Sequence, residues 1–276
     1  MKDLIIGAFT NYDYSQLKPW VESINESGFT GDKILIVGNA SPDTIGELEK
    51  QNFKIIPLPQ VNAPIHVARF IAMYNYLKDC WQDYRYILTT DVRDVYFQSD
   101  PMLWIEKNLH DKKLVAVSEA LAYQDEPWGN QNLLESYGPY IYELFKSKTI
   151  YNVGVFAGTS EFVKDLCLNI FLSAINRPVP IVDQAVFNML IQTEPYRSVV
   201  LFADQKDGFA CHAGTVADPL KMEMFRPKLI EGEPVFENNI VKTALGVPFS
   251  IVHQYDRVPA WQSYIGTKYN KMYKLC

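Results

Sequence analysis

The sequence has little cysteine, no excess of positive charge and no long apolar run. Its four cysteines are Cys80, Cys167, Cys211 and Cys276. They show no CxxC spacing, which argues against a zinc finger or a disulfide framework and favours a reducing, cytoplasmic setting. The net charge of −6 argues against general affinity for nucleic acid.

Membrane-spanning signals are lacking as well. No apolar stretch is long enough to cross a bilayer, and the N-terminus enters an apolar run without a signal-like segment. The segment Lys268 to Lys274 is mildly basic and aromatic, so any membrane contact is expected to be peripheral and to involve this tail. A solvated C-terminal end is the simpler interpretation.

Apolar runs and helical patterns alternate along the first part of the chain, as in an α/β protein. Leu4 to Phe9, Lys33 to Val37 and Phe53 to Ile56 are predicted strands. Ser15 and the Ser41-Pro42 pair are predicted to begin the helices between them. This is the order of a doubly wound, nucleotide-binding half. No GxGxxG turn follows the first strand, which counts against a dinucleotide-binding domain.

No domain boundary, internal repeat or low-complexity tract is visible. Residues 1–276 are therefore expected to form one domain, with a nucleotide-binding half over 1–101 and an acceptor-side half over 102–276.

Carboxylates gather after the predicted strand Tyr84 to Leu88. Asp91 and Asp94 follow that strand, at the carboxyl edge where α/β sheets bind ligands. Because neighbouring carboxylates repel each other, a divalent cation that also holds a phosphate chain would explain the pair. A turn is the alternative, since Asp is common in turns.

Other candidate residues follow in order along the chain. Arg69, on a helix predicted from Pro64 to Cys80, is either a solvated charge or a bridge to a carboxylate or phosphate. Asp183 begins a predicted helix and is either its N-cap or a functional group, whereas Gln184 has no comparable structural role. His253, with His212 as a competing candidate, could complete a mixed nitrogen and oxygen site suited to manganese.

Two further stretches suggest ligand contacts. The residues after the first strand could stack a base, and Asn39 ends the next strand at the same edge; loop packing is the alternative for each residue. The residues concerned are Phe9, Thr10, Tyr12 and Tyr14.

Ser118 to Ile150 is rich in aromatic and amide side chains, which suits a carbohydrate ligand, although a helical segment packed on the domain explains this composition equally well.

These stretches occur in one order that resembles the GT-A class of nucleotide-sugar-dependent glycosyltransferases, most of all the glycogenin-like family 8. Ala8 to Tyr14 is similar to the uridine-binding loop of that family, and Arg69 lies in a similar helix. Asn152-Val-Gly154 resembles its Asn-Ala-Gly strand, Asp183-Gln184 its Asp-Gln pair, and His253 its third metal ligand.

The chain departs from the family pattern at two points. The family's Asp-x-Asp motif reads Asp91-Val-Arg93-Asp94 here, and the family's Gly and Lys after the histidine are replaced by Tyr255-Asp256-Arg257. The diphosphate contact is therefore expected to pass to Arg257. The resemblance implies a GT-A-type, Rossmann-like α/β domain with a central, mostly parallel sheet flanked by helices.

The resemblance also implies a function: metal-dependent transfer of a sugar, with retention, from a nucleoside diphosphate sugar, a uridine one, to a carbohydrate, lipid-linked or protein acceptor. Mn²⁺, or Mg²⁺, would bridge the diphosphate through Asp94 and His253, with Asp91 beside it, and Arg69 would add positive charge. The residues expected to contact the sugars are Asn152, Asp183 and Gln184.

Other functions share parts of this sequence pattern. In an inverting reaction Asp183 would be the first candidate for the base. A dehalogenase-type phosphatase would need Asp-x-Asp, and a nucleotidyltransferase would need a glycine-rich basic loop after the first strand. A catalytically silent sugar- or nucleotide-binding scaffold with the same fold is the main alternative, and Arg93 inside the metal motif favours it.

Overall fold

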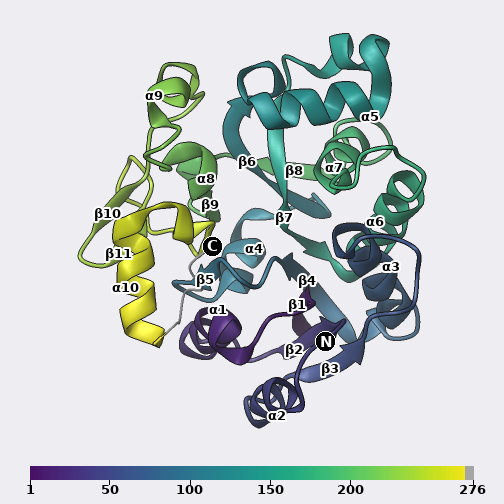
Figure 1. The fold of residues 1–276 in the computed structure, drawn as a ribbon, viewed down its shortest axis with the longest axis vertical. Coiled ribbons are helices and arrows are strands. Elements are labelled where there is room, and N and C mark those ends of the chain that lie inside the picture. Colours follow the sequence, from purple (N-terminus) through teal and green to yellow (C-terminus); the bar gives the residue numbers. More distant parts are fainter. Residues whose placement is uncertain (271–276) are drawn as a thin grey trace.

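The computed structural model describes residues 1–270, and within this range seven strands form a central sheet in the order β3-β2-β1-β4-β7-β6-β8 (Figure 1). The strands are β1 (Lys2–Phe9), β2 (Asp32–Val37), β3 (Lys54–Pro57), β4 (Tyr84–Thr90), β6 (Leu114–Ala122), β7 (Thr149–Thr159) and β8 (Val200–Ala203). β7 runs antiparallel to both of its neighbours, and the other pairs are parallel. The predicted mostly parallel sheet is confirmed.

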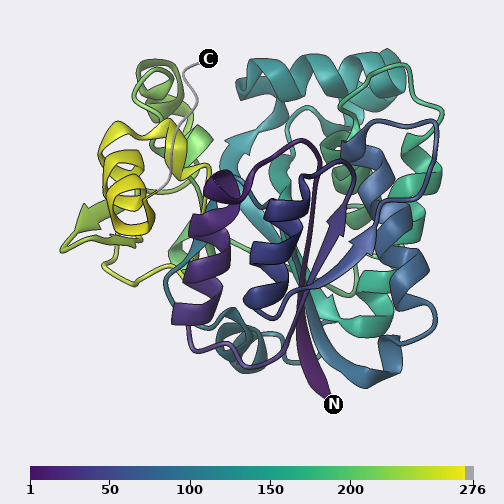
Figure 2. The ribbon, with the colours of Figure 1, turned by 60° about the horizontal axis from the view of Figure 1, so that its bottom comes forward.

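Helices cover both faces of this sheet, because its central strands are apolar on both sides. In β1, Leu4 and Ile6 belong to one core, whereas Ile5 belongs to the other. The first core packs beneath α3 (Ile65–Leu77), α6 (Ser160–Ala174) and α7 (Asp183–Ile191). The second packs beneath α1 (Tyr14–Glu26), α2 (Pro42–Lys50) and α4 (Pro101–Asn108). Figure 2 shows α1 and α2 side by side in front of the sheet.

A second, three-stranded sheet lies beside the main one and contains segments from distant parts of the chain. It consists of β5 (Val95–Phe97), β9 (Ala210–His212) and β12 (Ile251–His253), with β12 in the centre. β12 is antiparallel to β5 and parallel to β9. The elements around this sheet are α8 (Ala213–Val216), α9 (Met222–Phe225), β10 (Val235–Glu237), β11 (Ile240–Lys242) and α10 (Pro259–Tyr269), shown in green and yellow in Figure 1.

Local details differ from the sequence-based predictions. Asp13, not Ser15, caps α1: its carboxylate accepts from Gln16 N, and the Ser15 hydroxyl donates to it. The aromatic stretch after Ser118 continues β6 and then forms α5 (Pro127–Phe145), which is broken at Gly138, where φ is 74°. The helical alternative therefore holds for most of that stretch.

Residues 271–276, which include Cys276 and most of the predicted membrane-contacting tail, lie outside the described residues. The described start of that tail packs on α1, where Lys268 Nζ is 2.6 Å from a carboxylate oxygen of Glu26. No helix in residues 1–270 is both long and apolar enough to cross a membrane. The division into halves at residue 101 stays a prediction.

Candidate active site

Three predicted metal ligands meet where the two sheets adjoin. Asp91 directly follows β4, Asp94 directly precedes β5, and His253 is the last residue of β12. Backbone hydrogen bonds hold the turn between the strands, since Asp91 N donates to Gly154 O (2.8 Å) and Gln254 N donates to Asp94 O (2.7 Å). The carboxylates therefore lie at the carboxyl edge of a parallel strand, as predicted.

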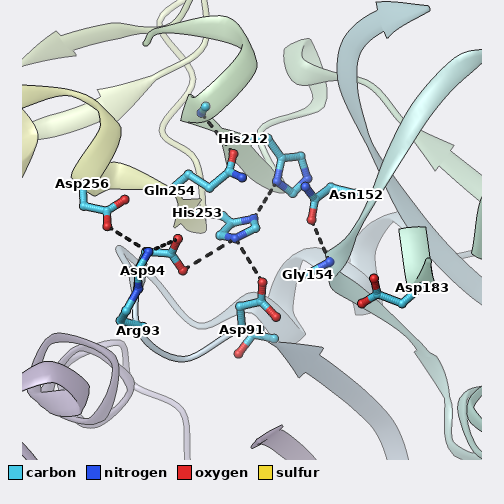
Figure 3. A network of polar contacts seen from close by, with 12 residues as sticks. Asp91, Arg93, Asp94, Asn152, Gly154, Asp183, His212, His253, Gln254 and Asp256 are labelled. Carbon is cyan, nitrogen blue, oxygen red and sulfur yellow. Dashed lines mark hydrogen bonds and ion pairs between the residues drawn. The ribbon is translucent and has the colours of Figure 1, made fainter. Parts of the chain in front are cut away.

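The geometry of this trio suits a divalent cation. His253 Nε2 lies 3.4 Å from Asp91 Oδ2 and 3.8 Å from Asp94 Oδ1 (Figure 3). The three ligand atoms lie within 4.8 Å of one another. Two carboxylates and one imidazole form a mixed oxygen and nitrogen donor set that first-row divalent metals accept. The residues present therefore fit a bound metal ion.

A glycine makes room for this arrangement. A β-carbon on Gly154 would lie 2.6 Å from His253 Cε1 and 2.7 Å from Asp91 Oδ2, closer than real β-carbons approach. The side chain of Asn152 folds back and accepts a hydrogen bond from Gly154 N (2.7 Å). The Asn-x-Gly motif on β7 thus keeps the backbone close to two of the three ligands.

Arg69 joins two of the predicted site carboxylates. The side chain is buried; Nη1 forms an ion pair with Asp91, and Nη2 donates to Asp183 Oδ2 (3.0 Å). Burial alone would raise the pKa of Asp91, but Arg69 and His253 outweigh it and hold that pKa well below its usual range. The bridge to carboxylates is one of the two roles predicted for Arg69.

Asp183 is not the N-cap of α7, so the structural alternative for this residue does not hold. Val182 occupies the cap position, and no side chain there makes a capping hydrogen bond. The Asp183 carboxylate is buried and bound by Arg69. Burial raises its pKa although Arg69 opposes this. The N-cap role thus does not explain the buried Asp183 carboxylate, and its function at the site stays a prediction.

Arg93, the departure inside the metal motif, lies beside one ligand. Its Nη2 is 3.4 Å from Asp94 Oδ2 and 3.2 Å from Asp256 Oδ2 (Figure 3). The guanidinium thus places positive charge on the outer side of Asp94, away from His253, which is near the other oxygen. Asp94 therefore directs Oδ1 towards His253, whereas its Oδ2 is paired with Arg93.

The trio opens into a cavity of about 380 Å³. Four predicted residues besides the trio and Arg69 line it: Asn152, Asp183, Gln184 and Arg257. Trp128, from the aromatic stretch expected to suit a carbohydrate, lines it as well. Other lining residues were not selected from the sequence, among them Glu119, Glu126, Lys221 and Gln254. Residues expected to contact the donor and residues expected to contact the acceptor thus line the same cavity.

Glu119 is the clearest omission from the predicted site. It is buried, its Oε1 accepts a hydrogen bond from Asn152 Nδ2, and burial raises its pKa to about 7. The register of β6 shifts here, and Ala120 has a φ of 57°. A carboxylate inside the apolar run from Leu114 to Ala122 was the available signal, because an unpaired charge is rarely buried without a reason.

A second cavity, of about 320 Å³, adjoins the first at the predicted nucleotide loop. Thr10 and Tyr12 line it together with Phe9, whose ring is 1 % exposed and stacks on that of Tyr12 with centroids 6.4 Å apart. Tyr12 therefore offers the accessible aromatic face. Two predicted contacts are engaged outside this cavity: Tyr14 donates to Glu22, and Asn39 donates to Asn11.

His212, the competing candidate ligand, lies behind His253. Its ring is fully buried, and its Nδ1 is 3.1 Å from Nδ1 of His253. Burial, together with the neighbouring His253, lowers the pKa of His212 well below its ordinary value. His253, and not His212, faces the carboxylates (Figure 3).

Solved glycosyltransferase structures resemble this fold. The galactosyltransferase LgtC, in complex with donor and acceptor sugar analogues, is 16 % identical, with a TM-score of 0.50 over 91 % of this chain and 86 % of that one. An active-site Gln-to-Glu mutant of LgtC is 14 % identical, with a TM-score of 0.53 over the same shares of the two chains. GlyE, a glycosyltransferase from Streptococcus pneumoniae TIGR4, is 13 % identical, with a TM-score of 0.56 over 96 % of this chain and 60 % of that one.

At these identities the likeness concerns the fold. It confirms the predicted GT-A-type architecture, an α/β domain with a mostly parallel sheet between layers of helices. No family model matches the chain, and no curated protein sequence does so either.

Proposed function

We propose that the protein is a metal-dependent glycosyltransferase that moves a sugar from a nucleoside diphosphate sugar, a uridine one, to an acceptor hydroxyl with retention of configuration. The observation that supports this most is the convergence of Asp91, Asp94 and His253 within 4.8 Å in the lining of the larger cavity. The glycosyltransferase fold of the solved neighbours supports it independently.

The trio would hold Mn²⁺ or Mg²⁺, with manganese favoured by the imidazole ligand. A divalent cation in this place supplies Lewis-acid stabilisation of the negative charge that develops on the leaving diphosphate. Arg257, half-exposed at the rim of the larger cavity, is proposed to contact the diphosphate from the other side. The smaller cavity would take the nucleoside, with Thr10 and Tyr12 beside the base.

The sugar is proposed to bind between β7 and α7. Asp183 would accept hydrogen bonds from donor hydroxyls through the oxygen that Arg69 leaves free, and Asn152 would contact donor or acceptor. Gln184 lines the same cavity and would lie near the anomeric carbon. LgtC has a glutamine in its active site, where the Gln-to-Glu mutant was made, and a glutamine in the cavity of this chain agrees with that.

Retention is supported by the state of the candidate bases. Asp183, the first choice for a base in an inverting reaction, has one oxygen engaged by Arg69. Glu119, another buried carboxylate of the cavity, also has one oxygen engaged, because its Oε1 accepts a hydrogen bond from Asn152. We therefore propose front-face attack by the acceptor, with both carboxylates orienting sugar contacts.

The acceptor is proposed to be a carbohydrate, a lipid-linked sugar or a protein. Trp128, 49 % exposed at the cavity rim, offers a ring face on which a sugar can stack. The free thiols of Cys80, Cys167 and Cys211 fit a reducing compartment, and we propose the cytoplasm. A catalytically silent scaffold is the second candidate, favoured by the pairing of Arg93 with Asp94.

The test is the thermal stability of the purified protein with uridine diphosphate, with and without Mn²⁺. Ligand binding to the native state at 100 times Kd stabilises it by about 2.7 kcal/mol, which raises the melting temperature. A manganese-dependent rise in the wild type and in Asp111→Ala, an exposed control, but not in Asp94→Ala, supports the donor site. Turnover of a sugar nucleotide then separates the enzyme from the scaffold. No shift with any nucleoside diphosphate would exclude the donor site.

A further inference from the structure

The pair His212 and His253 is a consequence of strand register. β9 and β12 run parallel, and the two histidines are direct partners in the ladder. Side chains of paired residues point to the same face of a sheet, so both rings project towards the site. The preceding pair, Cys211 and Val252, points the other way into the core formed with Tyr96.

The two rings meet through one nitrogen each. Nδ1 of His212 lies 3.1 Å from Nδ1 of His253, and the ring planes are at 84°. One of these nitrogens must donate a proton and the other must accept it, because two bare lone pairs at this distance repel each other. Nε2 of His253 faces Asp91 and Asp94, which as carboxylates accept hydrogen bonds or bind cations.

His212 has no other evident use in the site. Its ring is 0 % exposed, and among residues 1–270 its Nε2 has no hydrogen-bond partner. A buried imidazole with one polar contact costs desolvation that an apolar side chain would avoid. The contact with His253 is therefore the feature that distinguishes histidine from leucine at this position.

We propose that His212 is a positioning residue for the metal site: its Nδ1 accepts the proton of His253 Nδ1–H and so turns the Nε2 lone pair of His253 towards the cation. This inference rests on the metal site of the proposed function. Metal-binding histidines usually donate their second N–H to a carboxylate, a backbone carbonyl or water, and this donation sets both tautomer and ring orientation. Here a second imidazole provides the acceptor.

Without that acceptor, His253 loses the partner for Nδ1–H. The ring then gains more from placing its single proton on Nε2, where Asp91 accepts it. That tautomer has no lone pair for a cation. The loss of His212 thus changes the metal affinity without removing any ligand.

The experiment measures Mn²⁺ affinity by titration calorimetry, without substrate, in the wild type and three variants. His212→Leu removes the acceptor, and His212→Asn restores one because its Oδ1 can take the place of Nδ1. Cys211→Ala, buried on the opposite face of β9, reports the effect of lost packing alone. Loss of a partner beyond the ligand shell weakens metal binding by roughly 10- to 100-fold. We expect that loss in His212→Leu, recovery to within a few-fold in His212→Asn, and wild-type affinity in Cys211→Ala.

Nitrogen NMR of the metal-free protein tests the tautomer directly. The proposal requires a proton on Nδ1 of His253 and none on Nδ1 of His212. It is overturned by the reverse arrangement, or by His212→Leu binding Mn²⁺ as the wild type does. If the wild type binds no Mn²⁺ while the tautomers are as proposed, the metal part of the proposed function fails and the hydrogen-bond assignment stands. Because this NMR measurement uses the wild type, it tests the proposal even if His212→Leu does not fold.

Discussion

Gly154 and His253 lie so close that a β-carbon on the glycine would come within 2.6 Å of the imidazole Cε1. The close approach of β7, which carries Asn152, to His253 of β12 is therefore possible only because residue 154 has no β-carbon. Neither the imidazole nor Asp91 can retreat far, because His253 contacts His212 and Asp91 is paired with Arg69.

Gly154→Ala is expected to displace His253 or Asp91 and to weaken Mn²⁺ binding at least tenfold, since the ligands lose their common position. Overpacking of this kind also lowers the free energy of unfolding, by about 1–3 kcal/mol. Calorimetry with Mn²⁺ and urea unfolding measure the two effects. Gly46→Ala is the control, because nothing lies within 4 Å of a β-carbon there. Unchanged Mn²⁺ affinity in Gly154→Ala would show that the trio is not the metal site.

Arg69→Ala is expected to be strongly destabilising. It leaves Asp91 without its cation and Asp183 buried, and breaking a buried pair by removing one partner costs about 3–5 kcal/mol. Urea unfolding at neutral pH measures this cost. Arg85→Ala, which removes two more exposed ion pairs, one with Asp3 and one with Glu106, should cost about 1 kcal/mol or less for each pair. Equal losses in the two variants would contradict the structural role assigned to Arg69.

The stability of the protein should depend on pH through Glu119. Its pKa is raised by burial from 4.5 to about 7, against the hydrogen bond from Asn152, with Glu126 adding to the rise and His253 and Gln184 opposing it. The folded state therefore keeps a proton that the unfolded state releases above 4.5. The stabilisation is complete below 4.5 and is lost as the pH rises towards 7, at up to about 1.4 kcal/mol per pH unit.

Glu119→Gln isolates this contribution, because the amide oxygen can still accept from Asn152 but does not ionise. We expect the free energy of unfolding of the variant, measured in urea at about pH 5 and pH 7, to fall less with pH than that of the wild type. Other titrating groups cancel in the comparison. Parallel pH profiles for the two proteins would mean that Glu119 is not buried as a neutral acid.

Arg93 should weaken cation binding at the trio, because its guanidinium shares Asp94 with the site. Arg93→Gln is expected to tighten Mn²⁺ binding by roughly two- to tenfold, as the loss of one nearby positive charge predicts. Arg93→Lys keeps the charge and should behave as the wild type. If Mn²⁺ binds only after Arg93 is neutralised, the silent scaffold becomes the better account of the natural protein.

The sequence suggested the proposed metal trio because each member adjoins a short strand: Asp91 follows β4, Asp94 precedes β5, and His253 ends β12. A residue next to a strand end is expected at a sheet edge. Glu119 was not predicted, because its access to the cavity depends on the shifted register of β6 and the unusual φ of Ala120. The role proposed for His212 was not predicted either. It depends on the pairing of His212 with His253, and local sequence does not determine the register between distant strands. Tyr14 was selected because it follows the first strand, and Asn39 because it ends the next strand at the same edge. Both form hydrogen bonds with neighbours outside the smaller cavity, and their predicted donor contacts stay predictions.

The position of β12 between β5 and β9 has a consequence for how the protein matures. β12 follows β5 and β9 in the chain and yet is the central strand of their sheet, so β5 and β9 cannot pair through it until residues 251–253 have left the ribosome. Long-range pairing of this kind is slow, because loop closure precedes any gain from the contacts. All seven strands of the large sheet precede β12 in the chain, so that sheet can form first, and His253 would join Asp91 and Asp94 at the proposed metal site only in a later step.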